Sequence, residues 1–215
     1  VFVQMKLSVV SAEAAEKLVP LISKYANSQN KVSSADFFAN HPFHVRMADF
    51  SKRLAPPMRA GSFDRAKWFY ERTRGAYLDA QAHCTAAEKR LFVREYPKHQ
   101  TFTKTDLAKY LMVWTDRAYV VNRGAQKNFI EFAHEIAEAW EKDDKEFSEV
   151  YFKYLIAKKI IFDIAGQVVQ SRAWYEAGGY RSQHVVLSVA ALANAARAAG
   201  KTVNFLDIWE MQDVT

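Results

Sequence analysis

The order of apolar and polar positions along the chain predicts a protein built mainly of helices. Residues 1–10 show the alternating pattern that is typical of a strand. Beyond them, apolar residues recur every three or four positions, which indicates amphipathic helices. The predicted helices cover residues 11–26, 41–53, 85 to the proline at 97, 105–114, 124–140, 147–162, 182–199, and a short segment from 207 onward.

Capping and breaking residues set several of these boundaries. Thr85 is followed three positions later by Glu88, which is the pattern of a capping box, and Pro97 ends the helix that this box begins. Thr105 is placed to cap the next helix. Gly200 closes the alanine-rich helix near the end of the chain.

The segments between the helices complete the predicted architecture. Residues 27–40 are rich in Ser and Asn, which favours an ordered loop, and the aromatic-rich residues 67–72 favour a short strand or a buried extended segment. The expected fold class is therefore mainly α (α+β), a helical bundle-like domain with a few short strands near the N-terminus. We expect a single region over residues 1–215, with two sub-lobes: a basic, mixed α/β lobe at 1–80 and a helical lobe at 81–215.

Composition narrows the class of protein. Half of the 215 residues are hydrophobic and only seven are glycine, so the chain can bury a core without covalent cross-links. The single cysteine, Cys84, excludes an intrachain disulfide framework and a zinc module built on several cysteines. A chain with one cysteine suits a reducing compartment, so we expect a cytoplasmic protein. No apolar run reaches the roughly 20 residues of a membrane helix, which predicts a soluble protein. The first residue is Val1 and not Met, which predicts a piece of a longer chain.

The net charge of +6 is distributed unevenly. Residues 41–77 contain eight Lys or Arg against three Asp or Glu, whereas residues 135–149 contain seven acids against two lysines. The sequence therefore predicts a polarised molecule. Cations interleaved with aromatic rings suit a nucleic-acid surface, because the cations neutralise phosphates and the rings stack on bases. The alternative is that Trp68, Phe69 and Tyr70 belong to the core and that the arginines form a solvated face, partly paired with the acidic stretch.

Other constellations give weaker indications. His41 and His44 are spaced for one helix face but have no third metal ligand nearby, so capping or solvent-facing roles are expected. Residues 123–128 place Arg, Lys and amide side chains at a helix start, where free N–H groups can hold an anion. No P-loop and no nucleophile elbow occurs in the sequence. We assign no catalytic residue, no metal and no cofactor.

Several stretches of the sequence resemble the bacterial AIPR family, whose name stands for abortive infection phage resistance. The most specific of them is Lys-Trp-Phe-Tyr-Glu-Arg-Thr-Arg-Gly-Ala-Tyr. The five stretches lie at residues 26–32, 40–44, 67–77, 102–110 and 124–129. The resemblance implies a role in defence against phage and an upstream portion in longer members, in some cases like a restriction nuclease. The candidate positions that it picks out are Asn27, Gln29, Asn30, Trp68, Glu71, Arg72, Arg74 and Gly75.

These observations lead to one main hypothesis about function, a nucleic-acid-binding or target-recognition module in phage defence. Amide side chains can read base edges and guanidinium groups can hold phosphates. The predicted contact residues are Asn27, Gln29, Asn30, Arg65, Lys67, Arg72, Arg74, Tyr77, Arg123 and Lys127.

Two alternatives stay open. One is part of a divalent-metal-dependent nuclease that uses Glu71, Asp79 and Asp106. The other is a non-catalytic domain that docks the remainder of the parent protein, N-terminal to Val1. No membrane partner is expected, and homo-oligomerisation is left open.

Overall fold

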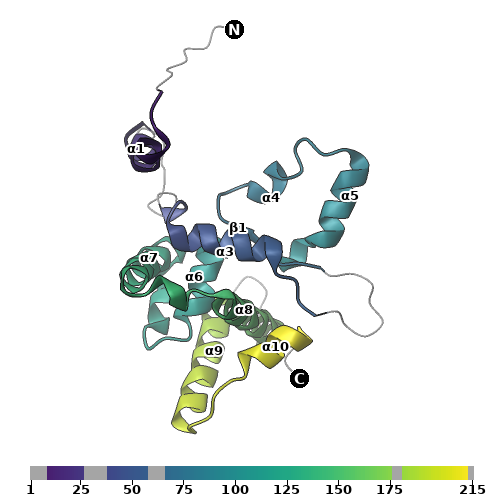
Figure 1. Cartoon of the computed structure of the whole chain (residues 1–215). Helices are drawn as coiled ribbons and strands as arrows, with labels where there is room; N and C mark the ends of the chain where they lie inside the picture. Colours follow the sequence, from purple (N-terminus) through teal and green to yellow (C-terminus); the bar gives the residue numbers. More distant parts are fainter. Residues whose placement is uncertain (1–8, 27–37, 58–65, 176–180, 213–215) are drawn as a thin grey trace.

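The computed structural model describes residues 9–26, 38–57, 66–175 and 181–212, and its fold is mainly α, as predicted (Figure 1). None of the described helices has the length and apolarity needed to cross a membrane. Most of the predicted strand at 1–10 lies outside the described residues. In chain order the elements are α1 (Ala12–Ala26), α3 (Pro42–Arg53), β1 (Phe69–Glu71), α4 (Ala76–Asp79), α5 (Ala86–Glu95), η1 (Lys98–Gln100), β2 (Thr101–Thr103), α6 (Lys104–Met112), η2 (Ala118–Arg123), α7 (Ala125–Lys142), η3 (Asp144–Glu146), α8 (Glu149–Gln170), α9 (Arg181–Ala198) and α10 (Phe205–Met211).

The predicted capping box of α5 is confirmed. The Thr85 side chain accepts the N–H of Glu88, and a carboxylate oxygen of Glu88 accepts the N–H of Thr85 at 2.7 Å. His41 caps α3, since its Nδ1 accepts the N–H of Phe43 at 3.3 Å. These local contacts satisfy N–H groups that a helix start leaves unpaired.

Two predicted helix starts were wrong by a few residues. The cap of α6 is Thr103 and not Thr105, because Thr103 has Asp106 three positions later and the two form a reciprocal capping box. The last helix is capped by Asn204, whose side chain accepts the N–H of Asp207, so α10 starts at Phe205 and not at Asp207.

The two strands pair in parallel, and this determines where the chain must go between them. Phe69, Tyr70 and Glu71 of β1 lie opposite Thr101, Phe102 and Thr103 of β2. Parallel neighbours need a long crossover connection, because the second strand must start from the same end of the sheet as the first. Here the crossover holds α4, α5 and η1, and Figure 1 shows these helices standing out from the other described helices. We call residues 74–100 the arm.

The position of the arm relates to the predicted sub-lobes. The expected boundary between residues 80 and 81 falls inside the arm, and β1 and β2 join the two sides of it in one sheet. The division at residue 80 stays a prediction.

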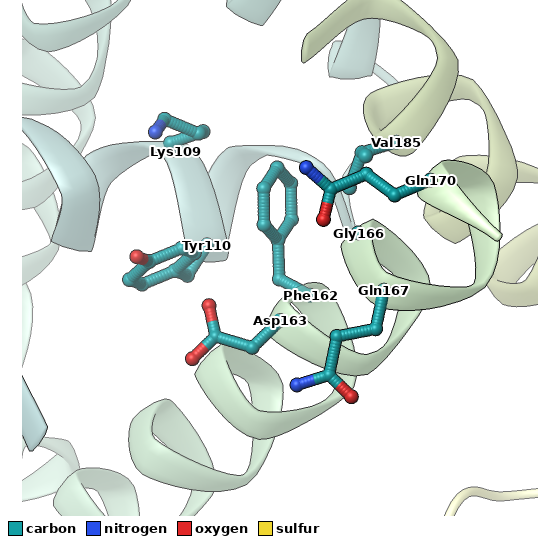
Figure 2. A pocket seen from close by; sticks show the side chains of 8 residues that line it. All are labelled: Lys109, Tyr110, Phe162, Asp163, Gly166, Gln167, Gln170 and Val185. Atoms are coloured by element: carbon teal, nitrogen blue, oxygen red, sulfur yellow. The ribbon is translucent and has the colours of Figure 1, made fainter. Parts of the chain in front are cut away.

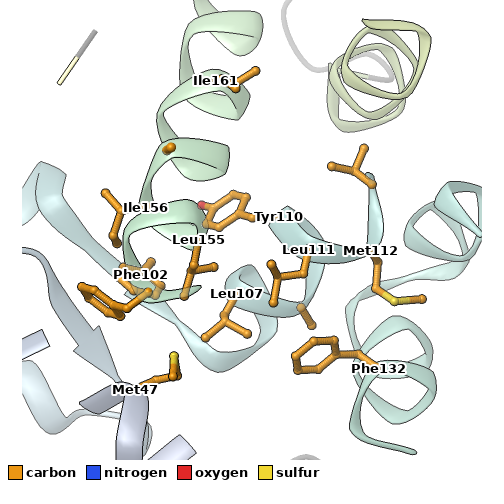
Figure 3. Close-up of a cluster of buried hydrophobic side chains, with 14 of the residues drawn as sticks. Met47, Phe102, Leu107, Tyr110, Leu111, Met112, Phe132, Leu155, Ile156 and Ile161 are labelled. Carbon is orange, nitrogen blue, oxygen red and sulfur yellow. The ribbon is translucent and has the colours of Figure 1, made fainter. Parts of the chain in front are cut away.

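The core forms around α6, which packs against α7 and α8, while α8 also packs against α9 and α10. Leu107 and Ala108 of α6 have no exposed surface. Figure 3 shows Leu107 and Tyr110 of α6 beside Leu155 of α8, and Ile156 of α8 beside Phe102 of β2. A helix covered on both sides must be apolar around most of its circumference, and α6 meets this condition.

A small polar cluster within this core fixes β1 to α3. The hydroxyl of Ser51 donates to the carbonyl of Trp68 at 2.6 Å and accepts the N–H of Tyr70 at 2.8 Å. Near the start of α3, His44 Nδ1 and the Tyr70 hydroxyl share a hydrogen bond of 2.6 Å. His44 is buried among aromatic rings, and this burial lowers its pKa to about 3. His44 is therefore a neutral core residue, and it carries no metal-binding role with His41.

The buried His44 makes the stability of the fold depend on acidity. The folded protein takes up this proton only near pH 3, whereas the unfolded chain takes it up near pH 6.5. Unfolding therefore binds a proton between these values, and the free energy of unfolding should fall as the pH falls from 6.5, by about 1.4 kcal/mol per pH unit from this group. Denaturant titrations from pH 7 to pH 4 should show this slope in the wild type and a smaller one in His44→Gln. His99→Gln, at an exposed position, should keep the wild-type slope; an equal slope in all three proteins would contradict the assignment.

Candidate nucleic-acid interface

Two of the three aromatic residues in the predicted contact stretch belong to the core. Trp68 is 5% exposed and Tyr70 is 4% exposed. The Trp68 indole N–H donates to the side-chain oxygen of Gln212 at 2.8 Å, and the ammonium of the buried Lys159 lies 4.7 Å from its ring. Neither ring is free to stack on a base. The core alternative for these aromatics is therefore the one that the structure supports.

Arg72 and Glu71 hold the local backbone. The Arg72 guanidinium donates to the carbonyl of Ala39 at 2.6 Å and to the side-chain oxygen of Asn40 at 2.8 Å, and so fixes the end of β1 to the segment before α3. The Glu71 carboxylate accepts the N–H of Gly75 at 2.6 Å. Gly75 has a φ of 86°, a left-handed conformation that favours glycine, and it begins α4.

The other predicted contacts at this end of the arm have internal partners as well. The Lys67 ammonium pairs with Glu95 at 2.7 Å. Tyr77 is 4% exposed, and its hydroxyl donates to the carbonyl of Tyr96 at 2.7 Å. Arg74, in contrast, is exposed. Among the predicted contact residues between 67 and 77, all of which the structure describes, Arg74 is the cation that lies on the surface.

The remaining predicted contacts fall into two groups. Arg123 is the last residue of η2, and Lys127 lies four residues later in the first turn of α7. Both side chains are exposed. The Arg123 guanidinium lies 5.9 Å from the ring of Tyr119. Asn27, Gln29, Asn30 and Arg65 lie outside the described residues.

The predicted polarity of the molecule is partly cancelled by ion pairs between the basic and acidic stretches. Arg46 of α3 pairs with Asp144 at 2.5 Å and lies over the ring of Trp140 at 4.2 Å. Arg53 pairs with Asp49 and, across the fold, with Glu149. The expectation of two separate charged poles was therefore wrong for α3, because the fold brings these arginines to the acidic stretch.

The arm has a small aromatic cluster as its base. Phe92 of α5 contacts Phe69 of β1, Tyr77 of α4 and Tyr96, with ring centroids 5.1–5.8 Å apart. The N–H of Lys67 also donates to the carbonyl of Glu95 at 2.7 Å. These contacts are all on one side of α5, and no residue of this fully described helix is buried.

The opposite side of α5 is cationic. Arg90 and Arg94 lie one turn apart on the face away from Phe92, and both are exposed. The exposed Lys89 lies on the flank between Arg90 and Phe92. The acids Glu88 and Glu95 follow the other flank of the helix, where Glu95 pairs with Lys67. Sequence analysis missed this surface because only two of its cations, Lys89 and Arg90, are adjacent in sequence; the helical spacing of Arg90 and Arg94 was the available signal.

The comparisons with known proteins give the family. A family model described as AIPR protein matches residues 1–215, which is the whole chain. This chain belongs to the AIPR family. No curated protein and no solved structure matches it significantly. Membership implies a role in defence against phage by abortive infection, as the sequence resemblance indicated.

The geometry explains several positions that the AIPR resemblance picked out. Trp68 packs in the core, Arg72 ties β1 to the segment before α3, and Glu71 with Gly75 shapes the turn into the arm. These residues build the local fold. Arg74 alone among the described family positions is an exposed cation.

Of the three carboxylates proposed for an AIPR nuclease, Glu71 and Asp106 are engaged in local structure, and Asp79 is exposed at the end of α4. Glu71 caps the turn at Gly75, and Asp106 accepts hydrogen bonds from Thr103 and from the ammonium of Lys109 at 3.0 Å. Burial raises the pKa of Asp106, but Lys109 and Thr103 outweigh this effect and lower it. Within the described ranges, no group of three or more His, Cys, Asp or Glu side chains is placed to hold a metal ion.

A cavity of about 550 Å³ lies beside α6 and α8 (Figure 2). Its charged wall residues already have counterions: Lys109 pairs with Asp106 and Asp163 pairs with the buried Lys159. Tyr110 and Phe162 supply the aromatic part of the wall. Because these charges are neutralised in pairs, the cavity favours neither a cationic nor an anionic ligand.

The aromatic base of the arm can be tested by truncating Phe92. Phe92→Ala should destabilise the arm locally by up to about 3 kcal/mol, because it removes one side of the four-ring cluster. Hydrogen exchange of the α5 amides should become faster, while exchange in α8 stays unchanged. Val93→Ala, at an exposed position of the same helix, is the matched control and should change neither. Faster exchange in α8 after Phe92→Ala would show that the arm is part of the core.

Proposed function

We propose that this AIPR protein binds nucleic acid, and that the cationic face of α5, together with Arg74, makes the contact with phosphates. The observation that carries the proposal is the separation of charge on α5. Arg90 and Arg94 face away from the aromatic base, Lys89 lies on one flank of the helix, and the two acids lie along the other flank. A row of exposed cations on one helix face can follow a phosphate backbone and release its counterions.

The surrounding structure supports the same surface. Lys98, whose ammonium lies 4.7 Å from the ring of Tyr77, adds a further exposed cation at the base of the arm. Arginines elsewhere in the basic stretch, such as Arg46 and Arg53, are paired with carboxylates of the fold. The arm therefore combines exposed positive charge with a position that stands out from the other described helices (Figure 1). Binding measurements with duplex DNA, single-stranded DNA and RNA distinguish which nucleic acid the arm prefers.

The proposal predicts binding that weakens steeply as salt increases. On duplex DNA, removing one phosphate-binding cation reduces the slope of log affinity against log salt by about 0.9. Lys89→Gln with Arg90→Gln should therefore reduce the slope by about two units for duplex DNA, measured by fluorescence anisotropy with labelled duplex DNA, single-stranded DNA and RNA.

The control for this experiment is Lys142→Gln with Lys145→Gln. These two lysines are also exposed, and they lie among the acids around the end of α7. This variant should keep the wild-type slope. Absence of binding by the wild type at low salt, or an equal reduction of the slope in both double variants, would rule out the arm as the interface.

A further inference from the structure

A second cavity, of about 430 Å³, lies between α8, α9 and the chain that leads into α10. Its volume is within the range of small-molecule sites. The residues that give it chemical character are three aromatic rings and three cations. They are Trp114, Tyr154, Phe205, Lys158, Arg197 and Lys201.

The aromatic rings lie together on one part of the wall. Phe205 is in edge contact with Trp114, with centroids 5.1 Å apart, and its ring is 5.4 Å from that of Tyr154. The indole N–H of Trp114 is buried and has no hydrogen-bond partner among the described residues. A buried donor without a partner costs free energy.

The cations give the cavity a net positive charge. Within the described part of the chain, no carboxylate lines the cavity together with Lys158, Arg197 and Lys201. Burial lowers the pKa of Lys158 to about 8, which shows that this ammonium is poorly hydrated. The Arg197 guanidinium donates to the side-chain oxygen of Asn194 at 2.8 Å, a contact that restrains it and adds no charge.

The turn after α9 brings one of these cations to the cavity. Gly200 has a φ of 63°, its N–H donates to the carbonyl of Arg197, and the N–H of Lys201 donates to the carbonyl of Ala196. This is the hydrogen-bond pattern of a helix end closed by glycine. It reverses the chain so that Lys201 lies on the same cavity as Lys158 of α8.

We propose that this cavity binds a small anion that carries a flat aromatic ring, of the nucleoside phosphate class. The aromatic wall offers faces and edges to a base, and the cations offer charge to its phosphates. The site is distinct from the arm, since its residues come from α8, α9, the segment after α6, the chain before α10 and the first residue of α10. Its test is therefore independent of the test of the nucleic-acid interface.

The test is calorimetric titration of the whole chain with ADP, GDP, CDP and UDP, and with adenosine and inorganic phosphate as partial ligands. At least one nucleotide should bind about ten-fold more tightly than either partial ligand, since it occupies the aromatic and the cationic parts of the wall together. Equal binding of phosphate alone would show a simple anion site and would overturn the proposal. Absence of binding by every nucleotide at millimolar concentration would overturn it as well.

Variants locate the site. Lys201→Gln removes a cation from an exposed position and should weaken nucleotide binding by about ten-fold, with unchanged thermal stability. Phe205→Leu should weaken it while leaving any residual phosphate binding unchanged. Arg172→Gln, at an exposed position that does not line the cavity, is the matched control. A loss of affinity in the Arg172 variant equal to that of the Lys201 variant would place the ligand elsewhere and contradict the assignment.

Discussion

The contact between Ser51 and β1 is the constraint on which the rest of the arrangement depends. One hydroxyl pairs with both the carbonyl of Trp68 and the N–H of Tyr70, so it satisfies two backbone groups that would otherwise be buried without partners. Leaving such a group unpaired costs about 1–3 kcal/mol. With β1 fixed on α3 in this way, β2 pairs in parallel beside it, and the intervening chain is forced outward as the arm. The crossover that carries α5 thus starts from a strand that two hydrogen bonds hold inside the core.

The location of the exposed positive charge follows from which cations find partners during folding. Residues 41–77 hold most of the excess charge in the sequence, but Arg46 and Arg53 face the acidic end of α7 and the start of α8, where carboxylates neutralise them. On α5 the helical spacing places the acids Glu88 and Glu95 on a separate flank from Arg90. The net charge of a stretch of sequence is therefore a poor guide to a binding surface, because ion pairs across the fold decide how much of that charge stays uncompensated at the surface.

Local signals in the sequence predicted most of the helices, and their failures have identifiable causes. The capping box at Thr85 was recognised, whereas the same rule applied to Asp106 selects Thr103, which the prediction passed over in favour of Thr105. The strand β2 has only three residues, and its partner is about thirty residues earlier, so no local pattern marks it. For the site, the aromatic run at Trp68 was attractive because its composition suits base stacking, but burial, which depends on the whole fold, assigns it to the core.

The arm and the cavity show two different ways of presenting positive charge, and each suits a different ligand. On α5 the cations are exposed on a convex helix face, where water screens them and only a polymer with many phosphates gains much from contact. In the cavity, Lys158 is poorly hydrated, and the neighbouring cations Arg197 and Lys201 share a wall with three aromatic rings. A small anion would gain there because it pairs with a half-buried ammonium that has lost part of its hydration and covers the rings at the same time. The two proposals thus assign a long polyanion to the arm and a single nucleotide-sized molecule to the cavity of one AIPR chain.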